Sequence, residues 1–342
     1  MLHAIGGFAA GSFYIPFKKV RKWAWETYWL VGGFFSWIIA PWVVCFLVCP
    51  NVLAILHHAP AKSLLWSYLF GVLWGIGGLT FGLTMRYLGM SLGYALALGF
   101  CAAFGTIIPP VFTHKFVGML HQTSGLVTLG GVLVSLFGIA VCGKAGVSKE
   151  RELSADQKKE AVSEFSFVKG VWIAIFAGIM SACMAFAIEA GKPIADLAVQ
   201  YKVPPLWQNS PLFIVIFAGG FTTNFIWCLI LSIRNKSGMN YISGPIPSQA
   251  ANYLLCAAAG ITWYCQFMFY GMGTTRMGQY NFSSWTIHMA FIIVFSNMWG
   301  LAFHEWRGSS RKTHNIIFAG ILILVASTVV VGLGNYIAML KQ

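Results

Sequence analysis

Acidic residues are scarce in this chain: nine Asp and Glu stand against 22 Lys and Arg among 342 residues. Charged residues make up 9% of the sequence, whereas soluble globular domains carry about 25%. This shortage argues strongly against a soluble enzyme of one or two domains. The net charge of +13 does not indicate a nucleic-acid-binding protein, because such proteins gather their basic residues in surface patches. Here the basic residues separate long apolar runs.

Several chemical motifs are missing as well. The eight cysteines form no CxxC pair and lie within apolar stretches, so we interpret them as reduced packing residues rather than as disulfides or zinc ligands. No GxGxxG or GxxxxGK[ST] pattern occurs in a nucleotide-binding setting, which disfavours an ATP-driven pump. The absence of HExxH, GxSxG and clustered carboxylates argues against an integral-membrane enzyme. We therefore expect neither a metal nor an organic cofactor.

Apolar residues dominate instead, at 58% of the chain, with a mean hydropathy of +0.73. A bilayer-spanning helix needs about 20 mostly apolar residues, and ten segments meet this description. They are approximately 2–18, 27–49, 64–85, 90–113, 123–143, 169–190, 211–233, 250–273, 284–304 and 315–339. The first is short and contains Pro16, but no basic stretch precedes it and no cleavage site follows, so we do not interpret it as a signal peptide. The sequence predicts an all-α integral membrane protein with ten transmembrane helices.

The connections between these segments differ in charge. Sixteen of the 22 basic residues fall in the odd-numbered connections and six in the even-numbered connections and the termini. The positive-inside rule makes the more basic set cytoplasmic, so both termini are expected to face outward. The stretch 144–168 holds five of the nine acids, alternating with Lys and Arg. We interpret it as a solvated, charged cytoplasmic linker.

Two groups of five segments flank this linker, and they are related by an offset of 189 residues. At this offset Gly71, Trp74, Gly82 and Gly89 correspond to Gly260, Trp263, Gly271 and Gly278, and Gly131, Leu133, Val141 and Gly143 correspond to Gly320, Leu322, Val330 and Gly332. We therefore divide the chain into a first repeat (1–143), the linker (144–168) and a second repeat (169–342). Because five spans is an odd number, the second repeat must be inverted, which is the pattern of secondary transporters.

Several local strings then suggest a family. Residues 12–19 (SFYIPFKK), 23–26 (WAWE), 82–91 (GLTMRYLGMS), 263–270 (WYCQFMFY) and 284–289 (SWTIHM) resemble the L-rhamnose–proton symporter family of the drug/metabolite transporter superfamily. The resemblance covers nearly the whole chain. It implies a five-plus-five inverted arrangement, a bacterial inner-membrane location, and uptake of a deoxy-sugar such as L-rhamnose with a proton.

The chain departs from the family pattern at four positions close to the expected midplane. Gly78 and Thr80 stand where amides are expected, Asn281 where an acid is expected, and Glu189 where a neutral residue is expected. These differences leave the sugar open, and with it the alternative of a facilitator or exporter of another small metabolite. A sugar sensor is disfavoured because no sizeable signalling domain is present. The oligomeric state is left open.

Proton coupling requires a titratable group within the membrane. Of the acids outside the linker, Glu26 and Glu305 are expected to anchor helix ends or pair with nearby Lys and Arg, and Asp196 to lie in an outer loop. Glu189 closes an apolar run and is a proton-coupling candidate, although Lys192 three residues later could simply pair with it.

His288 is the second proton-coupling candidate, because it lies inside an apolar run and imidazole titrates near neutral pH. It could also bind a sugar hydroxyl, or be an ordinary packing residue. The other seven histidines look terminal or loop-like.

Sugar binding requires flat aromatic faces and a few fixed hydrogen bonds. Trp74 and Trp263 occupy equivalent repeat positions and could face each other across a central cavity, although tryptophans are also common at membrane interfaces. Gln266 lies one helical turn after Trp263. Tyr14, beside Pro16, could lie where a broken helix exposes backbone. Together with Asn281 and His288, these are our substrate-binding candidates.

Overall fold

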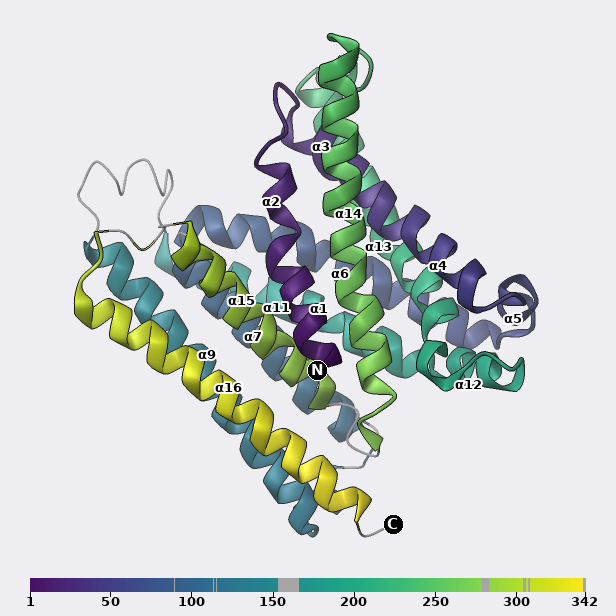
Figure 1. The fold of residues 1–342 in the computed structure, drawn as a ribbon, viewed down its shortest axis with the longest axis vertical. Helices are drawn as coiled ribbons and strands as arrows, with labels where there is room; N and C mark the ends of the chain where they lie inside the picture. Colours follow the sequence, from purple (N-terminus) through teal and green to yellow (C-terminus); the bar gives the residue numbers. More distant parts are fainter. Residues whose placement is uncertain are drawn as a thin grey trace.

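The computed structural model describes residues 1–88, 90–112, 114, 116–152, 166–278, 283–303, 306 and 308–340. All regular structure in this part of the chain is helical (Figure 1). Helices satisfy the main-chain hydrogen bonds of long apolar runs internally, which a bilayer requires.

The first half consists of ten helical elements in the described residues. They are α1 (Leu2–Ser12), α2 (Tyr14–Phe17), α3 (Trp25–Gly33), the π-helical segment η1 (Phe34–Ile39), α4 (Ala40–Val48), α5 (Val52–His58), α6 (Ala61–Leu88), α7 (Met90–Phe112), α8 (Phe116–Leu120) and α9 (Thr123–Glu152). The second half follows the same order of long helices. It comprises α11 (Phe167–Ala190), α12 (Lys192–Gln200), η2 (Pro205–Trp207), α13 (Ser210–Arg234), η3 (Gly238–Tyr241), α14 (Ile246–Thr274), α15 (Ser283–Ala302) and α16 (Arg311–Met339).

A helix occurs at each of the ten predicted segments, and seven helical stretches are long and apolar enough to cross a bilayer. These seven are Trp25–Val48, Ala61–Thr84, Thr123–Lys149, Val168–Gln200, Pro205–Arg234, Ser283–Ala302 and Arg311–Met339. Of the helices at the predicted segments, those outside this set are the short α1, α7 with its shorter apolar part Leu96–Val111, and α14. The chain is thus a multi-pass, all-helical membrane protein.

The helix α9 continues to Glu152, nine residues beyond the predicted end of its segment and into the charged linker. Residues 153–165 lie outside the described residues.

Helix packing joins the two halves. The helix α1 lies against α14 and α15, and α11 lies against α6 and α7. In the same way α13 packs on α6 and α14 on α3, while α9 and α16 run side by side (Figure 1). Each long helix has a counterpart in the other half: α1 matches α11, α3 matches α13, α6 matches α14, α7 matches α15 and α9 matches α16. When every helix is replaced by its counterpart, this set of contacts is unchanged.

Glycine contacts between α9 and α16 repeat this exchange at the level of single residues. A Cβ on Gly131 would lie 2.8 Å from the nitrogen of Val331, and a Cβ on Gly320 would lie 3.0 Å from the nitrogen of Cys142. Gly131 and Gly320 are related by the 189-residue offset, and so are Cys142 and Val331. The small residues let the two helices approach closely.

Large apolar side chains cover the outer faces of the helices. Leu133 on α9 and Leu322 on α16, which the repeat aligns, are 65% and 68% exposed. Exposed apolar side chains in such number suit contact with lipid rather than with water.

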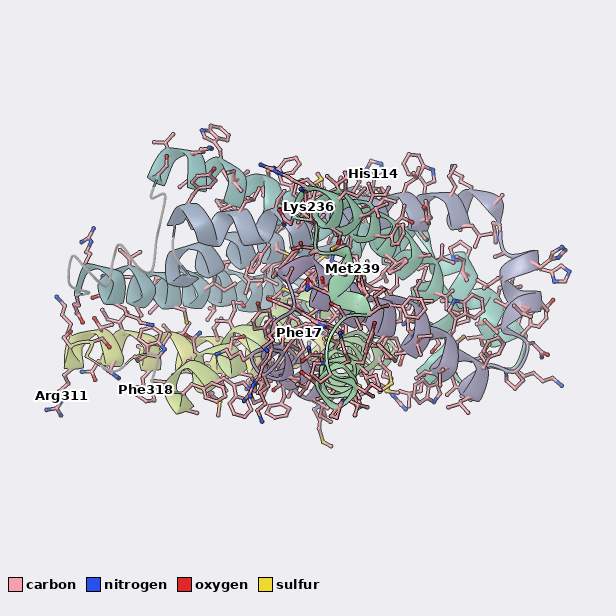
Figure 2. All side chains as sticks on the ribbon, turned by 90° about the horizontal axis from the view of Figure 1, so that it is seen from above. Phe17, His114, Lys236, Met239, Arg311 and Phe318 are labelled. Atoms are coloured by element: carbon pink, nitrogen blue, oxygen red, sulfur yellow. The ribbon has the colours of Figure 1, made fainter. Side chains whose placement is uncertain are left out.

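One end of the molecule carries a polar network that joins the connections at residues 18–24 and 235–245. Figure 2 looks onto this end and shows Lys236 and Met239 near its centre. Glu26 is buried here and accepts hydrogen bonds from Ser237 Oγ at 2.6 Å and Asn235 Nδ2 at 3.1 Å. Among the described residues Glu26 therefore binds amide and hydroxyl groups of the other half, rather than pairing with Lys or Arg.

Candidate functional site

An aromatic cluster lies where the two halves meet. The ring centroids of Trp74 on α6 and Trp263 on α14 are 5.5 Å apart, with an interplanar angle of 37°. Trp37 of the π-helical segment η1 contacts Trp263 edge-on at 5.5 Å and lies 6.4 Å from Trp74. The structure thus brings together the two tryptophans that the repeat paired, and adds a third that the sequence did not single out.

Trp37 has an unused hydrogen-bond donor. Its side chain is 5% exposed, and its Nε1 is buried with no hydrogen-bond partner among the described residues. A buried N–H without a partner is costly, and π-helical segments occur frequently at functional sites. Trp37 is therefore a candidate ligand donor, which sequence analysis missed because the local π-helix has no simple sequence pattern.

The space beside this cluster is small. A crevice bordered by Trp37, Trp263, Phe17 and Gly260 has a volume of about 10 Å³, which is room for no more than a single water molecule. The cluster is therefore closed at this point, and the helices must separate before a monosaccharide can enter there.

A second cluster contains two histidines. His288 on α15 is completely buried, and His3 on α1 is 6% exposed. Their ring centroids are 6.4 Å apart, and Tyr270 on α14 lies 5.0 Å from His288 and 5.8 Å from His3. Three helices from both halves therefore contribute to one group of potentially proton-binding or hydrogen-bonding side chains.

The ring nitrogens of this histidine pair lack partners. No described residue makes a regular hydrogen bond to Nδ1 or Nε2 of His3 or of His288, although the main chain of His3 approaches the His288 ring. Most buried polar side-chain atoms in folded proteins have a partner, so four unpaired nitrogens in one place require an explanation. The sequence-based interpretation of His3 as terminal or loop-like is wrong, because α1 begins at Leu2 and carries His3 into the interior.

Glycines make room for the two rings. A Cβ on Gly273 of α14 would lie 2.5 Å from Cε1 of His3, and a Cβ on Gly6 of α1 would lie 3.2 Å from Cε1 of His288. A side chain at either position would displace an imidazole. The local sequence thus allows these helices to close around the pair.

Phe267 connects the two clusters. Its ring centroid lies 5.1 Å from that of Trp263 and 6.2 Å from that of His288. It therefore fills the space between the indoles and the imidazoles, so the two clusters form one continuous region.

Glu189 lies near the end of α11 in an ion pair. Its carboxylate oxygens are 2.6 and 2.5 Å from Lys192 Nζ, and both side chains are about one-third exposed. This is the pairing that the sequence offered as the simpler explanation. Glu189 is thus engaged by Lys192 rather than by the histidine cluster.

The remaining substrate-binding candidates are dispersed. Gln266 is buried on α14, where its main-chain carbonyl oxygen would lie 2.8 Å from a Cβ on Gly6. Tyr14 is 39% exposed, with its hydroxyl 3.3 Å from that of Tyr28. Asn281 lies outside the described residues. The described part of the chain contains no group of three His, Cys, Asp or Glu side chains arranged to hold a metal ion.

Comparison with known proteins identifies the family. A family model described as "L-rhamnose-proton symport protein (RhaT)" matches residues 1–337. This chain belongs to that family. A protein named L-rhamnose-proton symporter from Cronobacter sakazakii is 39% identical over 335 residues, covering 97% of this chain and 96% of its own length. Proteins of the same name from Klebsiella pneumoniae and Escherichia coli are 38% identical over the same shares.

Membership of the RhaT family confirms the resemblance seen in the sequence. The family consists of symporters, so this chain is a transporter and not an enzyme, and the coupling ion of the family is the proton.

Proposed function

We propose that this protein takes up L-rhamnose, or a closely related deoxy-sugar, together with protons across a bacterial inner membrane. The family match over residues 1–337 and the names of the relatives support this assignment. One proton moving down about 100 mV releases roughly 2.3 kcal/mol, which allows about fifty-fold accumulation of a neutral sugar. A single coupled proton is therefore sufficient for useful uptake.

We further propose that the chain crosses the membrane ten times as an inverted five-plus-five repeat, in the manner of the drug/metabolite transporter superfamily. The helix contacts support this arrangement, because they stay the same when the helices of one half are replaced by their counterparts in the other. So does the pair of close approaches Gly131–Val331 and Gly320–Cys142. A pseudo-two-fold axis would pass between Trp74 and Trp263, because exchange of the halves maps their contact onto itself. With both termini outside, the basic connections face the cytoplasm.

The aromatic cluster suits the apolar side of a deoxy-sugar. The faces of Trp74 and Trp263 can pack against sugar C–H bonds and the methyl group, while the N–H of Trp37 donates to a hydroxyl. Gln266, one turn from Trp263, can supply an amide. Because the cluster is closed, sugar entry requires the two repeats to rock apart, as expected for alternating access.

The observation that carries the coupling proposal is the buried histidine pair with four unpaired ring nitrogens. An imidazole that gains a proton becomes a donor at both nitrogens, which raises its demand for acceptors. Sugar hydroxyls brought to the adjoining aromatic cluster can supply such acceptors. Proton and sugar then stabilise each other in the loaded state, which is the condition for symport. Of our two coupling candidates, His288 fits this arrangement better than the ion-paired Glu189.

The test is the external pH of de-energised vesicles after addition of L-rhamnose. We expect alkalinisation with the unmodified protein and with His58→Gln, a surface histidine whose Nδ1 contacts the Tyr201 hydroxyl. His288→Gln should abolish alkalinisation and accumulation while retaining exchange of labelled sugar.

Three results would change the proposal. Loss of alkalinisation in Glu189→Gln but not in His288→Gln would assign the proton to Glu189. Sugar entry without any pH change in the unmodified protein would indicate a facilitator. A verified membrane protein that moves no L-rhamnose or related sugar would restrict the family likeness to the fold.

A further inference from the structure

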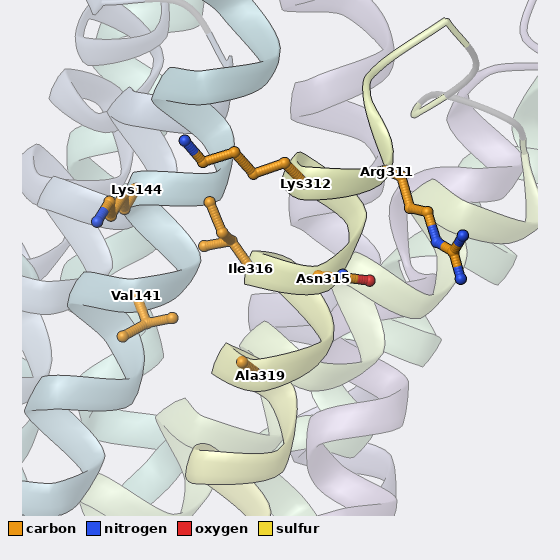
Figure 3. A pocket seen from close by; sticks show the side chains of 7 residues that line it. All are labelled: Val141, Lys144, Arg311, Lys312, Asn315, Ile316 and Ala319. Atoms are coloured by element: carbon orange, nitrogen blue, oxygen red, sulfur yellow. The ribbon is translucent and has the colours of Figure 1, made fainter.

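A groove lies between the last part of α9 and the first part of α16. Its volume is about 550 Å³, and its lining includes Val141 and Lys144 of α9 and Arg311, Lys312 and Ile316 of α16 (Figure 3). None of its lining residues belongs to the candidate transport site.

The charges of the groove are arranged around an apolar floor. Lys312 extends over Ile316 toward α9, and Lys144 leaves α9 with its ammonium group directed away from α16, whereas Arg311 turns to the other side of α16 (Figure 3). Val141 and Ile316 form apolar walls below the two ammonium groups. The groove thus has a cationic rim above and hydrocarbon below.

The basic side chains of the groove are available. Within the described part of the chain, neither Lys144 nor Lys312 forms a salt bridge, and both are exposed. Glu152, at the end of α9, is engaged elsewhere: it accepts hydrogen bonds from the Ser310 Oγ at 2.6 Å and the Thr313 Oγ1 at 2.7 Å.

We propose that this groove binds an anionic phospholipid, with its phosphate between Lys144 and Lys312 and its acyl chain along the apolar floor. Charge complementarity selects a negative head group, and basic pockets between membrane helices are suited to such lipids. The apolar surface selects a lipid over free phosphate, because it continues down the same face of α16 from Ile316 to Ala319, which is exposed. A bound lipid would bridge α9 and α16, the helices at matching places in the two halves.

The experiment measures binding and thermal stability of the purified protein with lipids of defined charge. The probes are phosphatidylglycerol, phosphatidylcholine and inorganic phosphate. The test variant is Lys144→Gln with Lys312→Gln, and the control with the same loss of charge is Lys62→Gln with Lys202→Gln, both of which are exposed. We expect phosphatidylglycerol to bind at least tenfold more tightly than phosphatidylcholine and to raise the melting temperature.

The test variant should lose this preference, and the control should keep it. Equal losses in the two variants would indicate non-specific attraction to surface charge and would overturn the proposal. A full effect of inorganic phosphate alone would make the groove a phosphate site and not a lipid site. An unmodified protein without any preference for phosphatidylglycerol would mean that another occupant covers the groove, which would also overturn it.

Discussion

Two helix interfaces that occupy matching places in the two halves differ in the side chains that they bury. On one side α11 packs against α6 and α7, and its buried residues are small or apolar, such as Ala174, Ala177 and Met184. On the other side α1 packs against α14 and α15, and the ring nitrogens of His3 and His288 are buried there with no regular hydrogen bond to a described residue. The shared helix arrangement therefore provides the frame, and one side of it carries groups that can bind a proton.

Aligned positions explain how the two sides came to differ. The 189-residue offset that pairs the central tryptophans also pairs Gly77 with Gln266 and Gly99 with His288. A Cβ on Gly77 would lie 2.6 Å from Oγ of Ser181 on α11, so a side chain as large as glutamine has no room there. At the α11 interface the main chains of the helices lie too close together for large side chains, whereas the α1 interface accommodates polar side chains at the matching positions.

The largest expected effect comes from breaking both interfaces in the same way. A Cβ on Gly7 would lie 2.9 Å from the carbonyl carbon of Phe291, and a Cβ on Gly178 would lie 3.0 Å from the nitrogen of Cys101. Gly7→Val and Gly178→Val should each destabilise the protein by about 1–3 kcal/mol or more through overpacking. Thermal unfolding in detergent measures this.

Gly130→Val is the matched control, because a Cβ at Gly130 meets no atom within 4 Å. The control should melt near the unmodified protein. If only one of the two interface variants melted early, the interfaces would not be equivalent in packing.

The second prediction separates chemistry from packing on the α1 side. Replacing His3 and His288 together by Leu should raise stability, because each substitution removes unpaired buried polar atoms that cost about 1–3 kcal/mol. The same variant should lose proton-coupled accumulation. Met184→Leu on the α11 side, a volume-conserving apolar change, should alter neither property. A lower melting temperature of the double variant would show that the rings have binding partners in the resting protein.

Much of the frame was predictable from the sequence, because hydropathy and the 189-residue offset depend on local composition and spacing. The same offset paired Trp74 with Trp263 and suggested that they face each other across a central cavity, whereas their rings lie 5.5 Å apart. Which titratable groups become buried was less predictable. His3 looked terminal, and Glu26 looked suited to an interface, because burial depends on how distant helices pack. The roles of Trp74, Trp263 and His288 in transport stay predictions.

The third prediction compares two tryptophans at the joint between the halves. Trp37 Nε1 is unpaired, whereas Trp285 Nε1 donates a hydrogen bond to the carbonyl oxygen of Cys101 at 3.1 Å. Trp37→Phe should weaken sugar binding about fivefold, the value of one hydrogen bond of about 1 kcal/mol, with unchanged stability. Trp285→Phe should lower stability and leave sugar affinity unchanged. Sugar counterflow and thermal unfolding measure the two properties, and a reversed pattern would remove Trp37 from the site.

The smallest effect is expected at the end of the α9–α16 pair where Glu152 of α9 contacts the start of α16. Hydrogen bonds from Ser310 and then Thr313 lower the pKa of Glu152 from its usual 4.5 to about 2. A carboxyl with a lowered pKa contributes stability above its unfolded pKa and loses it as the pH falls through the folded pKa. The first turn of α16 should thus be equally protected from pH 8 to pH 5.

Glu152→Gln should speed hydrogen exchange in that turn at every pH in this range, because the charge that holds Ser310, the N-cap of α16, is lost. Exchange in the first turn of α9, at the far end of the helix pair, should stay unchanged. A global increase in exchange would mean that Glu152 stabilises the whole α9–α16 pair. Protection that decays between pH 8 and pH 5 in the unmodified protein would show that the carboxylate is not held by these hydrogen bonds.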